Sequence, residues 1–248
     1  GNLNDAESCR ALATGCDAIV HAALERPGRT FRGGEGDPVE FAQTNLIGSL
    51  RLMEAARAAD VGRFVFISTC AVHEKSLDDR PLDETHPLWP MSHYGAYMAS
   101  VEKFIHSYGF GDGWPVCALR PTGVYGVKRP ARKSKWYPLI RSVVRGEDAK
   151  CSGGGKEVHA ADVAQAVEIL LAAEVIAGEA YSCCDRYVSA FEVAQLAKRI
   201  SGSSSKIIGE PKSPKHQIET GKLQALGMKF GGLSLLESTV RELVDAAK

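Results

Sequence analysis

Two apolar segments, Asp17-Ala-Ile-Val-His-Ala-Ala23 and Arg63-Phe-Val-Phe-Ile-Ser-Thr-Cys-Ala-Val-His73, decide the fold class of this 248-residue chain. Each is a short apolar run of the kind that forms a strand buried on both faces of a parallel sheet. Between them, Asp37-Pro38 opens a helix that is predicted to run to Ala59, with Pro in the first turn and apolar residues at helical spacing. This order of elements predicts parallel strands joined by right-handed crossovers.

The same alternation of strand and helix continues along the chain. A polar, Pro-containing loop leads to a helix that begins near Tyr94, and Trp114-Pro-Val-Cys-Ala-Leu-Arg-Pro121 is predicted to be another buried strand. A short helix is expected over residues 5–14, and a later one around residues 137–145. The fold class is therefore α/β, a doubly wound parallel sheet with helices on both faces.

The last third of the chain has a different character. Ser189-x-x-Glu192 and Ser234-x-x-Glu237 are capping boxes, and each predicts the start of a helix. They flank a polar segment, residues 201–219, with little apolar periodicity. This pattern predicts a small C-terminal lobe over residues 186–248, attached to a core formed by residues 1–150 with a contribution from residues 158–185.

The composition limits the partners and the compartment. Thirty basic and thirty acidic side chains give a formal net charge of zero, so no electrostatic argument supports binding to nucleic acid or to an anionic membrane. The seven Cys residues form no C-x-x-C pair and no apolar run approaches twenty residues. We therefore expect no metal site and a reducing, cytoplasmic location.

The segment Tyr94-Gly-Ala-Tyr-Met98 has the spacing of a tyrosine–lysine pair in which the lysine is replaced by methionine. Residues four apart lie on the same face of a helix, so a lysine at this position would lower the pKa of the phenol. Met98 has neither a charge nor a proton to donate. Lys103 lies nine positions from Tyr94, on the opposite face, and therefore cannot replace that lysine. If Tyr94 is catalytic, it acts without this cation.

Seven short motifs, in this order, carry a resemblance over nearly the whole chain. Together they resemble the extended short-chain dehydrogenase/reductase family, which includes the NAD-dependent epimerases and dehydratases and has a Rossmann-like fold. The motifs are Gly1-Asn2-Leu3, Asp17-x-x-Val20-His21-x-Ala23, Asn45-x-x-Gly48, Ser68-Thr69 followed by Ala71-Val72, Tyr94-Gly95-Ala96, Arg120-Pro121-x-x-Val124-Tyr125-Gly126 and His159-x-x-Asp162-Val163-Ala164.

The resemblance implies roles for individual residues. Thr69 would hydrogen-bond the reacting oxygen of the substrate, and Tyr94 would exchange a proton with it while a hydride moves to or from the nicotinamide of NAD or NADP. The residues implied to line the cofactor are Asn2, Leu3, His21, Ala22, Ala23 and Pro121, and those implied to contact a sugar-like substrate are Cys70, Thr122 and Gly123. His21 is interpreted as a packed side chain and Asn45 as a structural residue that bridges backbone groups through water. A homodimer that pairs through the helices at Asp37 and Tyr94 is also implied.

The sequence departs from the family at its beginning. Members of the family start with a strand and a Gly-x-x-Gly-x-x-Gly loop that holds the cofactor pyrophosphate at a helix N-terminus. This sequence has no such loop, and Gly33, Gly34 and Gly36 are interpreted as part of a mobile connection. The core is thus an incomplete dinucleotide-binding domain, in which the strand at residues 17–23 becomes an edge strand with exposed apolar surface. We expect an N-terminal part that is not represented here, or a partner that covers this edge.

Several alternatives stay open at this point. Met98 fits a changed but otherwise active enzyme, a natural pseudoenzyme that serves as a ligand sensor or interaction scaffold, or a mechanism that uses another cation. Gly123 stands where nucleotide-sugar enzymes of the family commonly have Asn, and no Arg precedes the Asp162 helix to clamp a diphosphate. Both features favour a smaller sugar, a sugar acid or another hydroxyl or carbonyl compound as substrate. The basic segment from Lys128 to Lys135 is interpreted as a solvated loop, with contact to an anion as the alternative.

Overall fold

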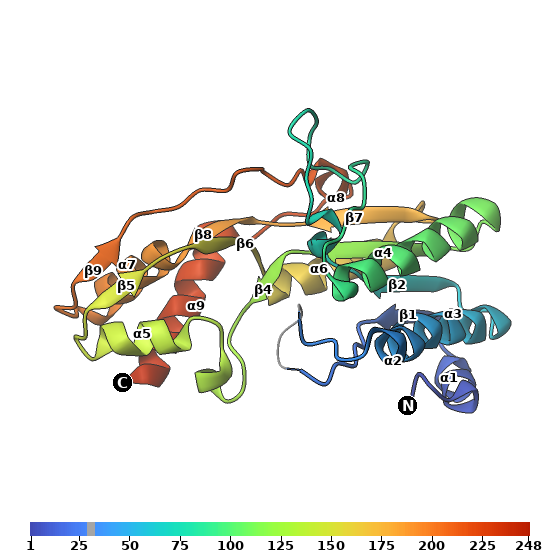
Figure 1. Ribbon diagram of the computed structural model, residues 1–248, viewed down its shortest axis with the longest axis horizontal. Helices are drawn as coiled ribbons and strands as arrows, with labels where there is room; N and C mark the ends of the chain where they lie inside the picture. The colour runs from blue at the N-terminus through green and yellow to red at the C-terminus, as the bar shows by residue number, and fades with distance from the viewer. Residues whose placement is uncertain (29–32) are drawn as a thin grey trace. The chain divides into compact units, whose positions relative to one another are not determined.

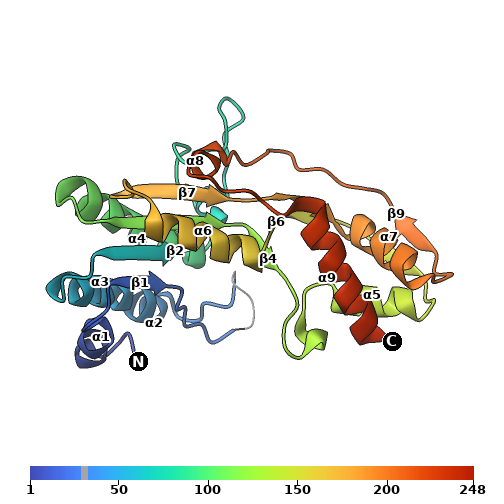
Figure 2. The same cartoon turned by 180° about the vertical axis from the view of Figure 1, so that it is seen from behind.

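The computed structural model describes residues 1–28 and 33–248 and divides into two compact units (Figures 1 and 2). The N-terminal unit consists of residues 1–121, 166–183 and 218–228, and the C-terminal unit consists of residues 122–165, 184–217 and 229–248. The boundary that the sequence suggested at residue 150 thus lies inside the C-terminal unit.

A four-stranded parallel sheet forms the centre of the N-terminal unit. Its strand order is β1-β2-β3-β7, and the strands are β1 (Ala18–His21), β2 (Arg63–Ile67), β3 (Val116–Pro121) and β7 (Glu179–Cys183). Figures 1 and 2 show α3 and α4 on one face of this sheet and α6 on the other. The predicted doubly wound parallel architecture is therefore confirmed.

The helices of this unit begin largely where the sequence predicted. Asp37 caps the predicted long helix by accepting the backbone N–H groups of Val39 and Glu40, both at 2.9 Å. That helix runs as α2, a π-helical turn over Gln43–Ile47, and α3. The helices are α1 (Ala6–Ala13), α2 (Pro38–Ala42), α3 (Gly48–Ala58), α4 (His93–His106) and α8 (Gly221–Ala225), and α6 (Ala160–Ala172) enters this unit at Ala166.

The apolar segment that starts at Arg63 is not a strand over its whole length, as the sequence had suggested. The strand ends at Ile67, and Cys70–His73 forms a 3-10 helix. Thr69 causes the change, because its hydroxyl oxygen accepts the backbone N–H of Ala71 at 3.1 Å and so caps this turn. The turn places Thr69 just beyond the carboxyl end of the sheet.

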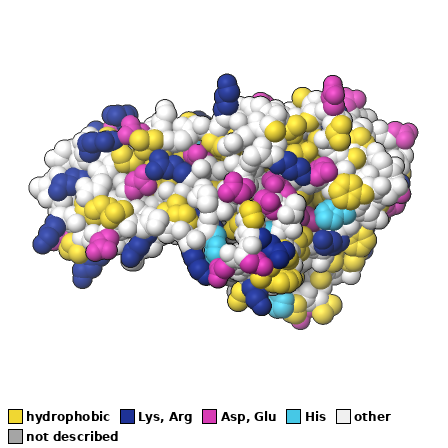
Figure 3. Space-filling model, turned by 90° about the horizontal axis from the view of Figure 1, so that it is seen from above, with side chains coloured by type: hydrophobic (Ala, Val, Ile, Leu, Met, Phe, Trp, Pro, Cys, Tyr) yellow, Lys and Arg dark blue, Asp and Glu magenta, His cyan; other side chains and the backbone are white. Residues whose placement is uncertain are grey.

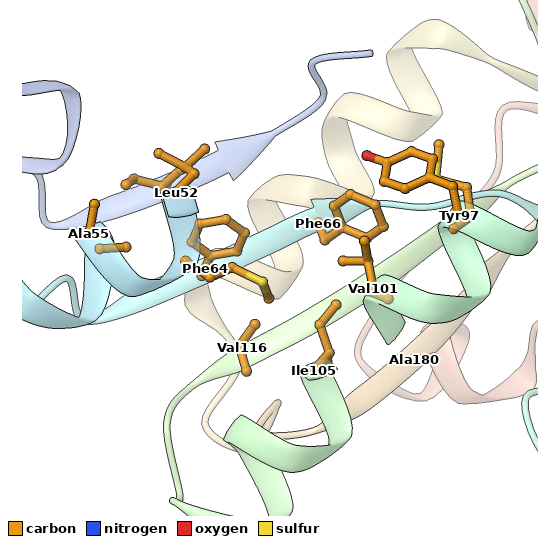
Figure 4. Close-up of a cluster of buried hydrophobic side chains, with 14 of the residues drawn as sticks. Leu52, Ala55, Phe64, Phe66, Tyr97, Val101, Ile105, Val116 and Ala180 are labelled. Carbon is orange, nitrogen blue, oxygen red and sulfur yellow. The ribbon is translucent and has the colours of Figure 1, made fainter. Parts of the chain in front are cut away.

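The core of the N-terminal unit lies between this sheet and the helices α3 and α4 (Figure 4). Phe64 and Phe66, two positions apart on β2, point to the same face and are at most 1% exposed. Tyr97 and Val101 project from α4 into the same cluster, and the rings of Phe66 and Tyr97 meet edge to face at 6.2 Å. Burial of these large side chains fixes α4 against the sheet.

The strand β1 lies at the edge of the sheet, as predicted. It pairs with β2 on one side and with none of the described residues on the other. Ile19 and His21 are buried, whereas Ala18 is exposed and Val20 is 42% exposed. The expectation of a strand buried on both faces therefore holds for one face only.

The C-terminal unit contains two small sheets and three helices among its described elements. One sheet has the order β4-β6-β8, with β6 parallel to β4 and antiparallel to β8, and the other pairs β5 with β9. Apolar side chains from α5, α7 and α9 form a second core. The elements are β4 (Gly123–Tyr125), α5 (Tyr137–Val144), β5 (Ala149–Cys151), β6 (Gly154–His159), β8 (Arg186–Ser189), α7 (Ala190–Ser201), β9 (Ile207–Gly209) and α9 (Gly232–Ala247).

The helix start predicted at Ser189 is confirmed, and the one predicted at Ser234 is wrong. Ser189 caps α7 by accepting the backbone N–H of Glu192 at 3.1 Å. Ser234, however, lies inside α9, which begins at Gly232. The start of α9 is held by Asp162 instead, whose Oδ1 accepts the N–H of Gly231 at 3.1 Å. A carboxylate distant in the sequence, and not a local Ser side chain, thus binds the backbone at the N-cap residue of α9.

Candidate active site

Thr69 presents a hydroxyl group at the carboxyl end of β2. Its backbone is extended, with φ −159° and ψ 150°, and its side chain is half-buried. The oxygen accepts the N–H of Ala71, so the hydroxyl proton can still be donated to another oxygen. A hydroxyl proton that can be donated is compatible with the role that the resemblance implies for Thr69, and the residue lies at the edge of the sheet where open α/β folds bind ligands.

Tyr94 lies in the first turn of α4, and the packing of Gly95 brings this turn close to Thr69. Ser92 caps the helix by accepting the N–H of Gly95 at 3.1 Å. A Cβ atom on Gly95 would lie 2.9 Å from the carbonyl oxygen of Ala71, a distance that real Cβ atoms do not show. Glycine therefore allows the Tyr94 helix to touch the 3-10 turn that follows Thr69. The structure brings these two elements together within one unit.

Met98 lies in the hydrophobic core and not in a polar pocket. It is 4% exposed and belongs to the same apolar cluster as Tyr94, which is 8% exposed. Lys103 is exposed, whereas Val101 is fully buried. The prediction that Lys103 cannot replace the missing lysine is therefore supported by its opposite position on the helix.

Sequence reasoning missed Glu35, a buried carboxylate at the start of the Tyr94 helix. Its Oε1 accepts the backbone N–H of Tyr94 at 3.2 Å, and its side chain is 6% exposed. Burial acts to raise the pKa of Glu35, but backbone N–H groups, including that of Tyr94, outweigh it and hold the pKa below its usual value. A negative charge here also interacts favourably with the helix dipole. An isolated Glu among glycines gave no signal of this role in the sequence.

His21 belongs to a buried polar cluster on the helix side of β1. Its Nε2 lies 2.8 Å from the hydroxyl of Ser49, which lies 3.2 Å from the hydroxyl of Tyr97. Burial lowers the pKa of His21 to about 4 and raises that of Tyr97 to about 12. Both groups are therefore neutral near pH 7. The interpretation of His21 as a packed side chain agrees with this environment.

Asn45 connects two stretches of backbone directly. Its Oδ1 accepts the N–H of Glu25 at 2.8 Å, and its Nδ2 donates to the carbonyl groups of Glu25 at 2.9 Å and Phe41 at 3.0 Å. It thereby fastens the segment after β1 to the helix that follows. The sequence suggested a structural bridge through water, and the contacts here are direct.

The residues implied to line a cofactor lie in the N-terminal unit and differ in accessibility. Ala22 and Ala23 are exposed at the carboxyl end of β1, and Asn2 is exposed near the chain start. Pro121 is buried at the end of β3, and Leu3 is half-buried and packs closely against Gly48. The small side chains exposed at the end of β1 leave room for a flat ring, such as a ring of a dinucleotide cofactor, to approach the backbone.

The described residues of the glycine-rich segment, 28 and 33–36, show no comparable fit for a pyrophosphate. Gly28 donates its N–H to the carbonyl of Gly34 at 2.9 Å, and a Cβ on Gly28 would lie 2.6 Å from the Cα of Gly34. These glycines allow two backbone segments to approach each other closely. The predicted mobility of this segment concerns residues 29–32 in part, which lie outside the described residues.

Of the residues implied to contact substrate, Cys70 lies in the N-terminal unit, and Thr122 and Gly123 lie in the C-terminal unit. Cys70 donates its Sγ–H to the carbonyl of Arg120 at 3.0 Å. A Cβ on Gly123 would lie 2.6 Å from a carboxylate oxygen of Glu157, and that carboxylate pairs with Lys135 at 2.5 Å. Glu157 thus occupies the space that a side chain at position 123 would need.

Neither a metal site nor a membrane-spanning helix is found among the residues that the structure describes. No group of three or more His, Cys, Asp or Glu side chains is arranged to hold a metal ion. None of the helices is long and apolar enough to cross a membrane.

A strand-end hydroxyl next to the first turn of a helix that carries a tyrosine, at the carboxyl edge of a doubly wound sheet, fits a Rossmann-type oxidoreductase. The family model described as "NAD dependent epimerase/dehydratase family" matches residues 1–184. The chain belongs to this family, as the sequence resemblance suggested.

Curated relatives share moderate identity over part of their length. A UDP-glucose 4-epimerase of Rhizobium leguminosarum bv. trifolii is 36% identical over 121 residues, which are 48% of this chain and 36% of that enzyme. A quinoline-oxide ketoreductase of Stigmatella aurantiaca is 31% identical over 183 residues, covering 70% of this chain and 50% of the relative. The chain therefore spans between about a third and a half of the length of these relatives.

Solved structures of similar fold cover almost the whole chain. A UDP-glucose 4-epimerase of Thermotoga maritima, solved with UDP-glucose, superposes with a TM-score of 0.78 at 22% identity and covers 99% of this chain and 82% of its own. The dTDP-glucose 4,6-dehydratase DesIV of Streptomyces venezuelae, solved with NAD and TYD, has a TM-score of 0.74 at 26% identity. The match covers 97% of this chain and 77% of the DesIV chain. The fold is therefore that of the epimerases and dehydratases.

Proposed function

We propose that this protein is an NAD(P)-dependent epimerase/dehydratase-like oxidoreductase that acts on a hydroxyl or carbonyl carbon of a sugar derivative. The observation that carries the proposal is the close packing of Gly95 against Ala71, which holds the Tyr94 helix beside the Thr69 turn. Thr69 would donate a hydrogen bond to the reacting oxygen, and Tyr94 would exchange the proton. The nicotinamide, when bound, accepts or returns a hydride. Similar proteins solved with NAD and with NADPH support this class of cofactor.

The charge distribution supports an anionic substrate. The C-terminal unit contains 18 Lys and Arg residues and 10 Asp and Glu residues, a formal charge of +8. The N-terminal unit contains 12 Lys and Arg and 20 Asp and Glu, a formal charge of −8, so the two units cancel in the net charge of the chain. Figure 3 shows several of these basic side chains on the surface of the C-terminal unit. A sugar linked to a phosphate carrier would be attracted to this unit, as UDP-glucose and dTDP-glucose would be. Glu157 fills the space beside Gly123, which counts against a bulky phosphate carrier at that one position and leaves a smaller sugar or sugar acid as the competing substrate.

Met98 is expected to impair turnover, because Tyr94 lacks the cation that would favour its phenolate. The test is Met98→Lys, with hydride transfer followed by nicotinamide absorbance in the presence of UDP-glucose, dTDP-glucose or glucuronate. We expect the rate to rise roughly tenfold or more. Ala96→Lys is the matched control, since Ala96 is exposed on the same helix and a lysine there would not lie beneath Tyr94.

The rival function is a catalytically silent ligand sensor or scaffold, and the burial of Met98 in the apolar core favours it. If Met98→Lys folds but gives no more hydride transfer than Ala96→Lys with any of the three substrates, the oxidoreductase proposal fails. Binding of NADH by calorimetry in the absence of turnover would then identify a sensor, and no binding would identify a scaffold.

A further inference from the structure

A buried network of charged and polar groups lies directly beneath the Thr69 turn. Its centre is the ion pair between Arg120, at the end of β3, and Glu102, on α4, whose side chains are 2% and 0% exposed. The Nε of Arg120 donates to both carboxylate oxygens at 3.1 Å, and Nη2 donates to Oε2 at 2.6 Å. This is the fork geometry in which an arginine binds a carboxylate most strongly.

Glu102 and Arg120 also accept hydrogen bonds from the residues on both sides of Thr69. The hydroxyl of Ser68 donates to Oε1 of Glu102, and Cys70 donates to the backbone carbonyl of Arg120 at 3.0 Å. Arg120 Nη1 donates to Nε2 of His73 at 3.1 Å. The turn that carries Thr69 is thus fastened at three points, none of which uses the hydroxyl of Thr69 itself.

His73 can take only one tautomer in this arrangement. Its Nε2 accepts from Arg120, so its Nδ1 carries the proton and donates to the carbonyl of Pro87 at 3.3 Å. Arg120 Nη1 also donates to the carbonyl of Glu84 at 3.3 Å. The network therefore connects the end of β3, the Tyr94 helix, the Thr69 turn and the loop between them.

Stability alone is a poor explanation for such a pair. Removing two charges from water costs about as much as their attraction returns, and replacing both with apolar side chains of similar size is often neutral. The pair does, however, fix geometry, because each of its hydrogen bonds has a defined direction. Glu102 lies on the same helix as Tyr94, and its carboxylate binds the residue next to Thr69.

We propose that Glu102 and Arg120 are positioning residues that hold the hydroxyl of Thr69 in register with the phenol of Tyr94. This role rests on the oxidoreductase function proposed above. Neither residue touches the reacting atoms. Their side chains act through Ser68 and His73, while the backbone carbonyl of Arg120 holds Cys70.

The test is the double variant Glu102→Leu/Arg120→Met in the Met98→Lys background. Removing both charges together avoids leaving one of them buried without a partner, so we expect the melting temperature to stay within a few degrees of the parent. We expect kcat for hydride transfer to fall roughly 10- to 100-fold, with KM for the cofactor unchanged, because a small misplacement of Thr69 acts on the transition state. The matched control is Lys222→Met/Glu179→Leu, which removes an ion pair of the same unit that lies outside the network and is 33% and 35% exposed.

A second measurement does not depend on activity. The methyl group of Thr69, observed by NMR, should report one rigid environment in the parent and in the Lys222/Glu179 control, and a broadened or split signal in the double variant. If the double variant does not fold, Ser68→Ala leaves the ion pair intact and removes one of the three attachments, and it should broaden the same signal.

The outcomes separate the two proposals. A Thr69 methyl signal unchanged in the double variant, or in Ser68→Ala where the double variant is unfolded, overturns the positioning role. A broadened signal with kcat unchanged also overturns it, because the turn would then move without affecting the reaction. A third outcome is that the Met98→Lys parent shows no hydride transfer but the Thr69 methyl signal broadens in the double variant. This result would count against the oxidoreductase function, and it would still show that the ion pair holds the Thr69 turn.

Discussion

Gly95 lies so close to Ala71 that a Cβ atom at position 95 would be 2.9 Å from the carbonyl oxygen of Ala71 and 2.8 Å from the Cβ of Pro90. Because one of these neighbours is backbone, a side chain at position 95 can be accommodated only if the helix or the turn moves. The separation between Thr69 and Tyr94 therefore depends on a residue that has no side chain.

Replacing Gly95 with Ala is expected to lower the free energy of unfolding by about 1–3 kcal/mol, the usual cost of overpacking a dense site. It should also reduce any hydride transfer, because α4 must shift relative to Thr69. Gly111→Ala is the control, since nothing lies within 4 Å of a Cβ there and its φ is not positive. The measurement is the free energy of unfolding of both variants in urea. Equal stability of Gly95→Ala and the original protein would show that the turn yields without cost.

The charge of Glu35 gives a second prediction. Glu35→Gln keeps an oxygen that can accept the N–H of Tyr94 but removes the negative charge at the helix N-terminus, which is worth about 0.3–2 kcal/mol. Because the pKa of Glu35 is held below its usual value in the folded protein, this stability is present above the unfolded pKa and is lost as the pH falls through the folded value. Unfolding measured from pH 7 to pH 3 should show the two proteins converging in acid. The control is Glu40→Gln, because Glu40 is an exposed acidic residue in the first turn of α2. This variant should lose less stability at pH 7 than Glu35→Gln.

Two buried histidines predict a loss of stability in mild acid. Burial lowers the pKa of His21 to about 4, and burial together with the charge of Arg120 lowers the pKa of His73 to about 4. The folded protein therefore resists a proton that the unfolded chain takes up near pH 6.5, and stability is lost as the pH falls from about 6.5 to about 4.

Each histidine should account for about 3 kcal/mol over this range, since one pKa unit is worth 1.36 kcal/mol. The check is the pH dependence of urea unfolding for His21→Gln, with the exposed His93→Gln as control. The His21 variant should show a shallower loss of stability below pH 6.5 than the control. The same slope in both would mean that His21 takes up a proton without unfolding the protein.

The sequence predicted most of the fold because the relevant signals were local. The cap of Asp37, the apolar run at Phe64 and the Ser189 capping box each depend on neighbouring residues, and each was found where predicted. The Ser234 prediction failed because α9 begins earlier, where Asp162, 69 positions before Gly231 in the sequence, accepts the N–H of Gly231. Local patterns do not contain that information.

The candidate site was only partly predictable for the same reason. Thr69 and Tyr94 were identified by short motifs, but Glu35 and the Glu102–Arg120 pair depend on contacts between distant segments. Nothing in the spacing of Glu35 and Tyr94, or of Glu102 and Arg120, indicates that their side chains and backbone groups meet. Only the packing of α4 against the sheet brings them together.

The open edge of β1 gives the last prediction. Val20 is 42% exposed and Ala18 is exposed, and the strand pairs on one side only among the described residues. Unpaired backbone groups beside exposed apolar side chains favour association with another strand, and a lysine at such an edge opposes it. We therefore expect this 26.6 kDa chain to self-associate at high concentration and Val20→Lys to shift it toward monomer in sedimentation experiments. Val39→Lys is the control, because Val39 is 75% exposed and belongs to α2 and not to the strand. A stable monomer at all concentrations would show that the edge is protected within the chain itself, and a shift by Val39→Lys but not by Val20→Lys would place the contact on the helices.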